Sequence, residues 1–227
     1  MKNPNSKTSL FLAFLFLAIC FSETGLQAQK EVAPEPSHYV FPKFMVGSVK
    51  MKNGAVESAV MDYNKLSEEM IFEQNGKMLA LDQLETIDTV TIDSRKFIPF
   101  GKFFLENNVN APISLWTEHK CNVLIAGHPA GYGGTSETSA TTSVSSVNSM
   151  GGRYQLKLPG EYHITNATLY WIKKGNSFYK ANSRNQILKI FPEKSKEIKQ
   201  FIKQNNLDLK NVKDLIVLVN KCNEIYR

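Results

Sequence analysis

Long apolar runs are scarce in this 227-residue chain, and a single stretch comes near the length of a membrane span. It covers residues 10–21 (LFLAFLFLAICF) and is shorter than the roughly 20 residues that a spanning helix requires. Lys2 and Lys7 precede this run, and the small residue Ala28 follows it. A positive start, a short apolar run and a small residue at the cut are typical of a secretory signal peptide. We therefore expect removal of residues 1–28 on export and no transmembrane segment in the mature chain.

Cysteine is also rare: the chain has three, and Cys20 lies in the leader. Lipidation of Cys20 is an alternative to simple cleavage, but Ile19 is larger than the residue that a lipidation signal places there. The two remaining cysteines of an exported chain can form one disulfide. Cys121 and Cys222 lie at apolar positions of a predicted strand and a predicted helix, so we expect both to face one core. Either a disulfide joins the helix to the sheet, or the two thiols are buried apart.

Motifs for nucleotide binding, zinc binding and serine hydrolysis are missing. The chain has no G-x-x-x-x-G-K-[ST], no G-x-G-x-x-G, no H-E-x-x-H, no C-x-x-C and no G-x-S-x-G. Its net charge of +6 becomes +5 when residues 1–28, with Lys2, Lys7 and Glu23, are removed (6 − 2 + 1), and such a small surplus spread along an exported chain favours solubility over nucleic-acid binding. We expect no cofactor and no nucleic-acid partner.

Short alternating segments with tight turns fill residues 46–126. Asn-Gly pairs at 53–54 and 75–76 separate alternating runs, and this dipeptide is a strong hairpin signal because both residues tolerate positive φ. The other strands predicted here are 87–92, 113–125 and a bent or edge strand at 95–106, which contains Pro99 and Gly101. The pattern predicts an antiparallel meander, open or closed into a small barrel.

The pattern changes from strands to helices at Pro192. Ile198 and Ile202 recur at helical spacing, and proline suits the first turn of a helix. A second helix follows, with Asp208 or Asn211 as its N-cap and one apolar stripe to bury. The predicted fold class is α+β, mainly β: an antiparallel meander or small barrel-like sheets followed by two C-terminal helices that cover the sheet.

Composition divides the chain into segments. The predicted order is a signal peptide at 1–28, an extended N-terminal tether at 29–45, an N-terminal β subdomain at 46–126, a flexible Gly/Ser/Thr loop at 127–152, a second β segment at 153–191 and a C-terminal helical hairpin at 192–227. Within the second β segment, the expected elements are a strand at 153–158, a hairpin at 169–181 and a closing strand at 186–191.

The hairpin at 169–181 predicts the clearest candidate binding surface. A two-residue turn at Gly175-Asn176 sets its register, and the pairs that this register places opposite the core are Trp171 with Lys180 and Lys173 with Phe178. Exposed aromatic rings can stack on a sugar while lysines meet an acidic group, although such pairs also stabilise a sheet without a ligand. Tyr132 offers a further aromatic contact if the Gly/Ser/Thr loop acts as a binding lid instead of a plain connection. The candidate ligand contacts are Tyr132, Trp171, Lys173, Phe178 and Lys180.

His119 and Cys121 are expected on one face of the strand at 113–125, with His128 following in the loop. These three residues could ligate a metal, but a core histidine and cysteine explain the same pattern. A metal-dependent or other hydrolase using His119, His128 and an acid such as Glu118 is therefore the enzymatic alternative to a non-catalytic role.

Three stretches of the chain carry a resemblance: the leader ending in LQAQ, the segment GSVKMKNG…MDYN…EEMIFEQNGKMLAL, and the closing KEIKQFIKQNNLDLKNVKDLIVLVNKCN. In these stretches the chain resembles exported proteins of Bacteroidota that have no assigned activity. The resemblance implies the periplasm or the outer membrane of a diderm bacterium. We expect a non-catalytic binding or structural module with an envelope protein or glycan as partner. An assembly subunit that pairs through an exposed edge strand is a third possibility.

Overall fold

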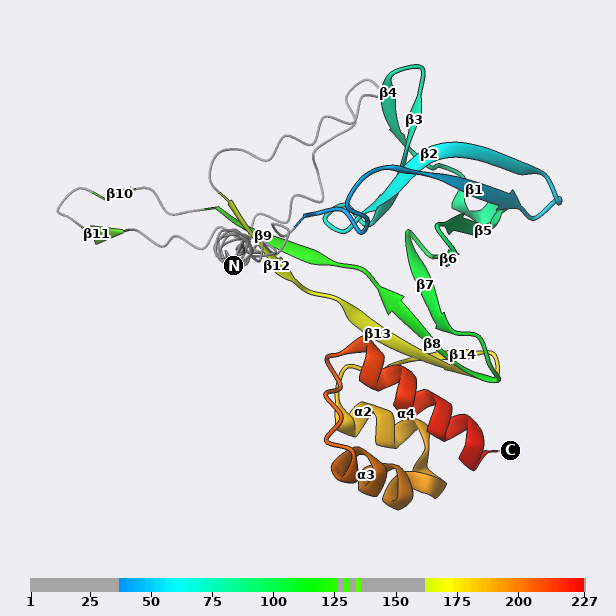
Figure 1. The fold of residues 1–227 in the computed structure, drawn as a ribbon, viewed down its shortest axis with the longest axis vertical. Helices are drawn as coiled ribbons and strands as arrows, with labels where there is room; N and C mark the ends of the chain where they lie inside the picture. Colours follow the sequence, from blue (N-terminus) through cyan, green and yellow to red (C-terminus); the bar gives the residue numbers. More distant parts are fainter. Residues whose placement is uncertain (1–36, 126–128, 131–133, 136–161, 227) are drawn as a thin grey trace, which may run out of the picture. The chain divides into compact units, whose positions relative to one another are not determined.

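An open antiparallel sheet organises the part of the protein that the structure describes (Figure 1). The computed structural model describes residues 37–125, 129–130, 134–135 and 162–226. The sheet has 10 strands in the order β14-β13-β8-β7-β6-β5-β1-β2-β3-β4, so β14 and β4 are its edges. The strands of the protein are β1 (Met45–Met51), β2 (Val56–Asn64), β3 (Glu69–Gln74), β4 (Lys77–Ala80), β5 (Ile87–Ile92), β6 (Arg95–Phe100), β7 (Phe103–Val109), β8 (Ile113–Glu118), β9 (Cys121–Ile125), β10 (Pro129–Ala130), β11 (Gly134–Thr135), β12 (Tyr162–Asn166), β13 (Leu169–Lys174) and β14 (Ser177–Lys180). The predicted mainly β class is confirmed, and the sheet does not close into a barrel.

Both predicted Asn-Gly hairpins are present, but their turns differ in length. Asn75 and Gly76 alone join β3 to β4, with φ values of 53° and 72° as a tight hairpin turn requires. The turn between β1 and β2 is longer, and within it Gly54 has a φ of 91°. The side chain of Asn53 accepts a hydrogen bond from the backbone N–H of Ala55 at 2.9 Å, which fixes this longer turn.

The segment predicted as a bent or edge strand forms a hairpin inside the sheet. It contributes β6 and β7, which pair with each other and lie between β5 and β8. Pro99 is tolerated because the pairing of β6 with β5 ends at Phe97, before the proline is reached. Gly101 supplies the turn with a φ of 65°.

Residues 113–125 form two strands, whereas the sequence predicts one. β8 ends before His119, and β9 pairs instead with β12 in a separate two-stranded sheet. β13 pairs with β8, so β13 and β14 extend the main sheet. β10 and β11 pair with each other within the Gly/Ser/Thr segment, most of which lies outside the described residues, as does the strand predicted at 153–158.

Helices follow the last strand, and one of them replaces a predicted strand. The helices are α2 (Arg184–Ile190), α3 (Ser195–Gln204) and α4 (Val212–Ile225), with short 3-10 turns η1 (Leu84–Thr86) and η2 (Pro192–Lys194). The closing strand predicted at 186–191 is wrong, because Ser183 caps α2 and the buried residues Ile187 and Ile190 lie one helical turn apart. The predicted N-cap Asn211 is confirmed by its hydrogen bond from the N–H of Lys213. None of the helices within the described residues has the length and apolar character needed to cross a membrane.

Two apolar clusters form the core. Helices α2 and α4 pack on β14, β8 and β7 and share the first cluster, whose buried members include Leu115, Tyr170, Ile172, Ile187, Ile198, Leu218 and Cys222. The second cluster lies among β1 to β3 and β5 to β7, and its buried members include Phe41, Met61, Tyr63, Val90, Phe97 and Phe104. Both clusters reach the strands that carry the candidate site.

Residues 37–44, the described part of the predicted extended tether that precedes β1, contact the sheet. Tyr39 forms a bridge with Asn64 at the end of β2. Phe41 is 5% exposed and belongs to the second cluster. Its backbone N–H donates to the carboxylate of Asp62 at 3.2 Å, so β2 holds this part of the predicted tether in place.

Candidate functional site

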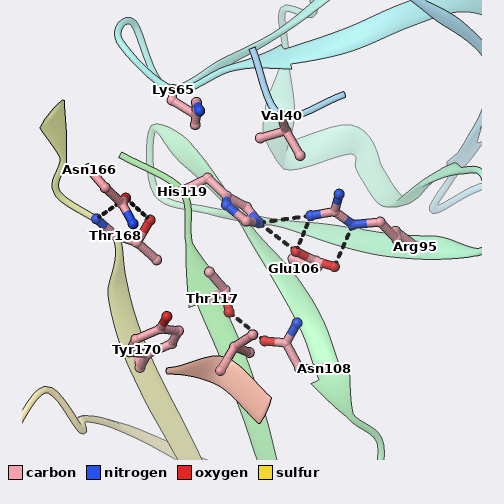
Figure 2. Close-up of a pocket in the computed structure, with 11 residues that line it drawn as sticks. Val40, Lys65, Arg95, Glu106, Asn108, Thr117, His119, Asn166, Thr168 and Tyr170 are labelled. Carbon is pink, nitrogen blue, oxygen red and sulfur yellow. Dashed lines mark hydrogen bonds and ion pairs between the residues drawn. The ribbon is translucent and has the colours of Figure 1, made fainter. Parts of the chain in front are cut away.

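A pocket of about 540 Å³ borders both apolar clusters (Figure 2). Tyr170 and Val212 on its wall belong to or pack against the helix-covered cluster, and Val40 packs against the other. The remaining lining side chains are polar or charged: Lys65, Arg95, Glu106, Asn108, Thr117, His119, Asn166 and Thr168. The volume lies within the range typical of small-molecule sites.

Strand register explains why these polar side chains meet. Glu106 on β7 is the direct partner of Thr117 on β8, and Thr117 is the direct partner of Tyr170 on β13. Direct partners in an antiparallel pair point to the same face of the sheet. His119 follows two residues after Thr117 and lies on the same side, as the alternation in the sequence predicts.

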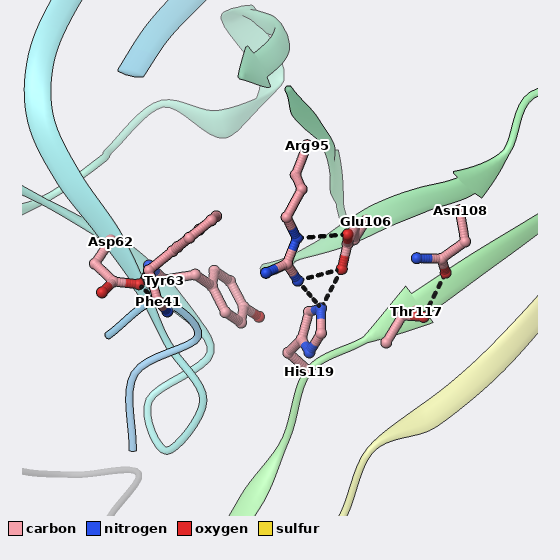
Figure 3. Close-up of polar contacts among 8 residues, drawn as sticks. All are labelled: Phe41, Asp62, Tyr63, Arg95, Glu106, Asn108, Thr117 and His119. Atoms are coloured by element: carbon pink, nitrogen blue, oxygen red, sulfur yellow. Dashed lines mark hydrogen bonds and ion pairs between the residues drawn. The ribbon is translucent and has the colours of Figure 1, made fainter. Parts of the chain in front are cut away.

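The carboxylate of Glu106 forms hydrogen bonds with Arg95 and His119 at the centre of this face (Figure 3). The guanidinium of Arg95 donates from Nε to Oε1 at 2.7 Å and from Nη2 to Oε2 at 2.6 Å. His119 contacts the second carboxylate oxygen through Nε2, which therefore carries the proton of this hydrogen bond. Burial opposes ionisation of Glu106, but the hydrogen bonds from His119 and Arg95 outweigh it and lower the pKa to about 2.

Aromatic rings fix the positions of Arg95 and His119. The guanidinium carbon of Arg95 lies 4.7 Å from the centre of the Phe41 ring. The His119 ring lies 6.3 Å from both Tyr63 and Phe97, measured between ring centres. Because these rings belong to or line the second cluster, the charged group is preorganised by packing as well as by hydrogen bonds.

Lys65 enters the pocket from the loop after β2 as a half-buried cation. Burial lowers the pKa of its ammonium group, and the nearby Cys121 and Asp62 raise it in part. No carboxylate among the described residues forms an ion pair with Lys65.

The predicted hairpin surface forms with the predicted register. Trp171 pairs with Lys180 and Lys173 pairs with Phe178. The same register predicts Tyr170, Ile172 and Tyr179 on the core face; Tyr170 and Ile172 are buried there, but the prediction is wrong for Tyr179, which is 43% exposed because β14 is an edge strand. Tyr132 lies outside the described residues, so four of the five candidate ligand contacts can be placed.

Two further aromatic residues from neighbouring strands join this surface. Phe100 lies 4.9 Å from Phe178 and 5.5 Å from Trp171 between ring centres, and Trp116 lies 5.8 Å from Phe178. The ammonium groups of Lys173 and Lys180 each lie 5.5 Å from a ring centre, over Phe178 and Trp171. We call Phe100, Trp116, Trp171, Lys173, Phe178 and Lys180 the aromatic–lysine face.

The residues of the enzymatic alternative are not brought together as a set. Glu118 lies on the face of β8 opposite to Thr117, where it accepts a hydrogen bond from the indole of Trp171 at 2.8 Å. His128 lies outside the described residues. Within the described part of the chain, no group of three or more His, Cys, Asp or Glu side chains is placed to hold a metal ion.

The expectation that both cysteines face one core is wrong. Cys222 is buried in the helix-covered cluster, whereas Cys121 is buried outside it, and both are free thiols. The cause is the break at His119 and Lys120, after which β9 leaves the main sheet. The disulfide that the sequence offers as one alternative is not formed in this structure, and burial raises the pKa of the Cys222 thiol to about 12.

Sequence reasoning missed Arg95, Glu106 and Lys65. A signal was present, since a hairpin turn at Gly101 puts Arg95 and Glu106 on the same face as Phe97. Interpreting the segment as one strand hid that relation. Lys65 gave no signal, because its position depends on how the loop after β2 packs.

Comparisons with known proteins supply no relative from which a role could be transferred. No protein-family model, curated protein or solved structure matches the chain at a significant level. The function is therefore argued from the geometry of the pocket and of the aromatic–lysine face.

Proposed function

We propose that this chain is an exported, non-catalytic binding module of the envelope of a diderm bacterium, and that its ligand occupies the pocket. The leader of residues 1–28 supports export, and the pocket supports binding. The expected location is the periplasm or the outer membrane. An envelope protein or glycan is the expected source of the ligand.

The observation that carries the proposal is the direction of the hydroxyl groups in the pocket. Thr117 donates to the side-chain oxygen of Asn108, and Thr168 donates to that of Asn166. The hydroxyl of Tyr170 donates to the backbone carbonyl of Lys210 at 3.1 Å. A nucleophilic hydroxyl requires a hydrogen bond to a base. These three hydroxyl groups instead donate to the oxygens of side-chain or backbone amides.

One feature supports the alternative of a hydrolase, namely the hydrogen bond between His119 and Glu106. A carboxylate that orients a histidine is part of many hydrolytic sites. The alternative is tested with chromogenic esters, glycosides and phosphate esters, comparing the wild type with His119→Gln. We expect no turnover by either protein, and turnover that His119→Gln abolishes would contradict the proposal.

The aromatic–lysine face is a second candidate surface for the same binding function. Aromatic rings from β6, β8, β13 and β14 gather there beside two lysines, a combination suited to stacking on an acidic sugar. The pocket is favoured because both lysines of this face already lie over rings.

Native mass spectrometry of the protein purified from cell envelopes tests the proposal directly. We expect a stoichiometric small molecule on the wild type, its loss from the pocket variant Asn166→Leu, and its retention by the surface control Tyr179→Ala. Recovery of the protein among cytoplasmic proteins would contradict export. A molecule that Asn166→Leu retains and Trp171→Ala loses would move the site to the aromatic–lysine face.

A further inference from the structure

We propose that the pocket recognises a monoanionic carboxylate on a sugar-sized ligand, with Lys65 as the counter-charge. This inference rests on the proposed binding function and adds the chemical class of the ligand. The inference rests on which donors and acceptors of the pocket already form hydrogen bonds with neighbouring residues and which do not.

The carboxylate oxygens and the side-chain amide oxygens of the pocket already accept hydrogen bonds from neighbouring residues. Both carboxylate oxygens of Glu106 accept from Arg95, and one also meets His119. The side-chain oxygen of Asn108 accepts from Thr117, and that of Asn166 accepts from the hydroxyl and the N–H of Thr168. A ligand that is rich in donors would therefore find few acceptors here.

Several donors of the pocket have no acceptor among the described residues. They are the ammonium of Lys65, the third guanidinium nitrogen of Arg95 and the amide nitrogens of Asn108 and Asn166. In Figure 2 the dashed contacts of Arg95 start from two of its three guanidinium nitrogens. An excess of donors over free acceptors complements a ligand that carries several oxygen acceptors.

The charges of the lining select among oxygen-rich ligands. Arg95 and Glu106 neutralise each other, whereas Lys65 forms no ion pair within the described residues, although Asp62 is close enough to raise the pKa of its ammonium group. The buried carboxylate of Asp62 lies outside the lining, where it accepts backbone hydrogen bonds from Phe41 and Tyr63. A single cation that forms no ion pair within the described residues matches one carboxylate better than a doubly charged phosphate, and a half-buried ion pair is strengthened by its low-dielectric surroundings.

The remaining wall suits a sugar ring. Val40, Val212 and the ring of Tyr170 supply apolar contact on the sides of the pocket. Its volume of about 540 Å³ is ample for a monosaccharide and leaves room for a linked second ring. A uronate combines one carboxylate, several hydroxyl oxygens and an apolar ring face, so it is the class we name.

Isothermal titration calorimetry with matched sugars tests the inference. The probes are galacturonate, glucuronate, the neutral parents galactose and glucose, inorganic phosphate, and trigalacturonate for a chain-borne uronate. We expect a uronate to bind at least tenfold more tightly than its neutral parent and than phosphate. Binding of trigalacturonate but not of the free acid would identify a chain end as the source of the same carboxylate.

Variants of Lys65 test whether its charge is the one that binds the carboxylate of the uronate. Lys65→Met and Lys65→Gln should each weaken uronate binding at least tenfold and leave the neutral sugar unaffected, whereas Lys180→Met on the aromatic–lysine face should bind as the wild type does. Equal affinity for uronate and neutral parent would overturn the inference, as would full affinity in both Lys65 variants or no binding of any uronate. A neutral molecule found in the pocket by native mass spectrometry would overturn the inference alone, whereas an empty pocket with measurable turnover would overturn the proposed function.

Discussion

The lysines on the two faces of β8 and β13 differ in whether they contact an aromatic ring or a carboxylate within the fold. On the aromatic–lysine face, Lys173 and Lys180 lie over rings, and nearby Lys120 pairs with Glu68 at 2.7 Å and with Glu118 at 3.6 Å. On the pocket face, Lys65 is half-buried and has no ion pair within the described residues. Partners within the fold explain the first three lysines. Lys65 is more simply explained by a partner outside the fold.

The largest effect should come from removing the acid that neutralises the pocket. Glu106→Gln leaves Arg95 without its bidentate partner, and we expect a loss of about 3 kcal/mol in the free energy of unfolding at pH 7. Because the pKa of Glu106 in the folded protein lies below the ordinary 4.5, its contribution is complete above that pH and is lost as the pH falls toward 2. Urea unfolding from pH 7 to pH 2 measures the difference, with exposed Glu57→Gln as the control. A constant difference across this range would contradict the assignment.

The next effect separates packing from binding on the opposite face. Trp171→Ala removes a half-buried ring and its hydrogen bond to Glu118, so we expect a loss of about 2 kcal/mol in stability with unchanged uronate affinity. Tyr179→Ala on the same hairpin should cost much less, since that ring is exposed on an edge strand. Denaturant unfolding and calorimetry measure both quantities. Loss of affinity in a folded Trp171→Ala would favour the aromatic–lysine face as the site.

A third prediction concerns Asp62, the buried acid that holds Phe41 over Arg95. Burial raises its pKa to about 6, although backbone hydrogen bonds from Phe41 and Tyr63 oppose the rise. A folded pKa above the ordinary 3.8 gives a stability contribution that is lost as the pH rises through 6. Relative to Asp62→Asn, the wild type should lose on the order of 1 kcal/mol between pH 5 and pH 7. The exposed Asp88→Asn should show no such change, and a flat difference for Asp62→Asn would contradict the prediction.

The smallest effect contrasts two lysines. Lys65→Met removes a half-buried charge that forms no ion pair with any residue the structure describes, so stability should change by less than about 0.5 kcal/mol or rise slightly. Lys120→Met breaks contacts with Glu68 and Glu118 and should cost up to about 1 kcal/mol, limited by its partial exposure. Thermal and denaturant unfolding compare the two. A larger loss for Lys65→Met than for Lys120→Met would indicate an internal role for Lys65.

Features that depend on neighbouring residues were predictable from the sequence. Asn75-Gly76 set the turn of one hairpin, and Gly175-Asn176 set the register of another, so that Trp171 meets Lys180 as expected. The position of His119 on the same side as Thr117 followed from the alternation along the strand predicted at 113–125.

Features that depend on distant contacts were not predictable in the same way. The apolar run at 186–191 fits a strand or a helix, and Ser183 together with burial against the helical cluster decides for the helix. The pairing of Arg95 with Glu106 depends on a hairpin turn inside a segment that reads as one strand. The location of Lys65 depends on the packing of a loop, which carries no periodic signal.

Nuclear magnetic resonance titration with galacturonate tests the central claim most directly, because the two faces carry different side-chain reporters. Trp116 and Trp171 are the two tryptophans of the chain and both lie on the aromatic–lysine face, whereas Asn108 and Asn166 line the pocket. We predict that the side-chain amide signals of Asn108 and Asn166 shift on addition of galacturonate and that both indole signals stay in place. Shifts of the indole signals with unchanged asparagine amides would contradict the account.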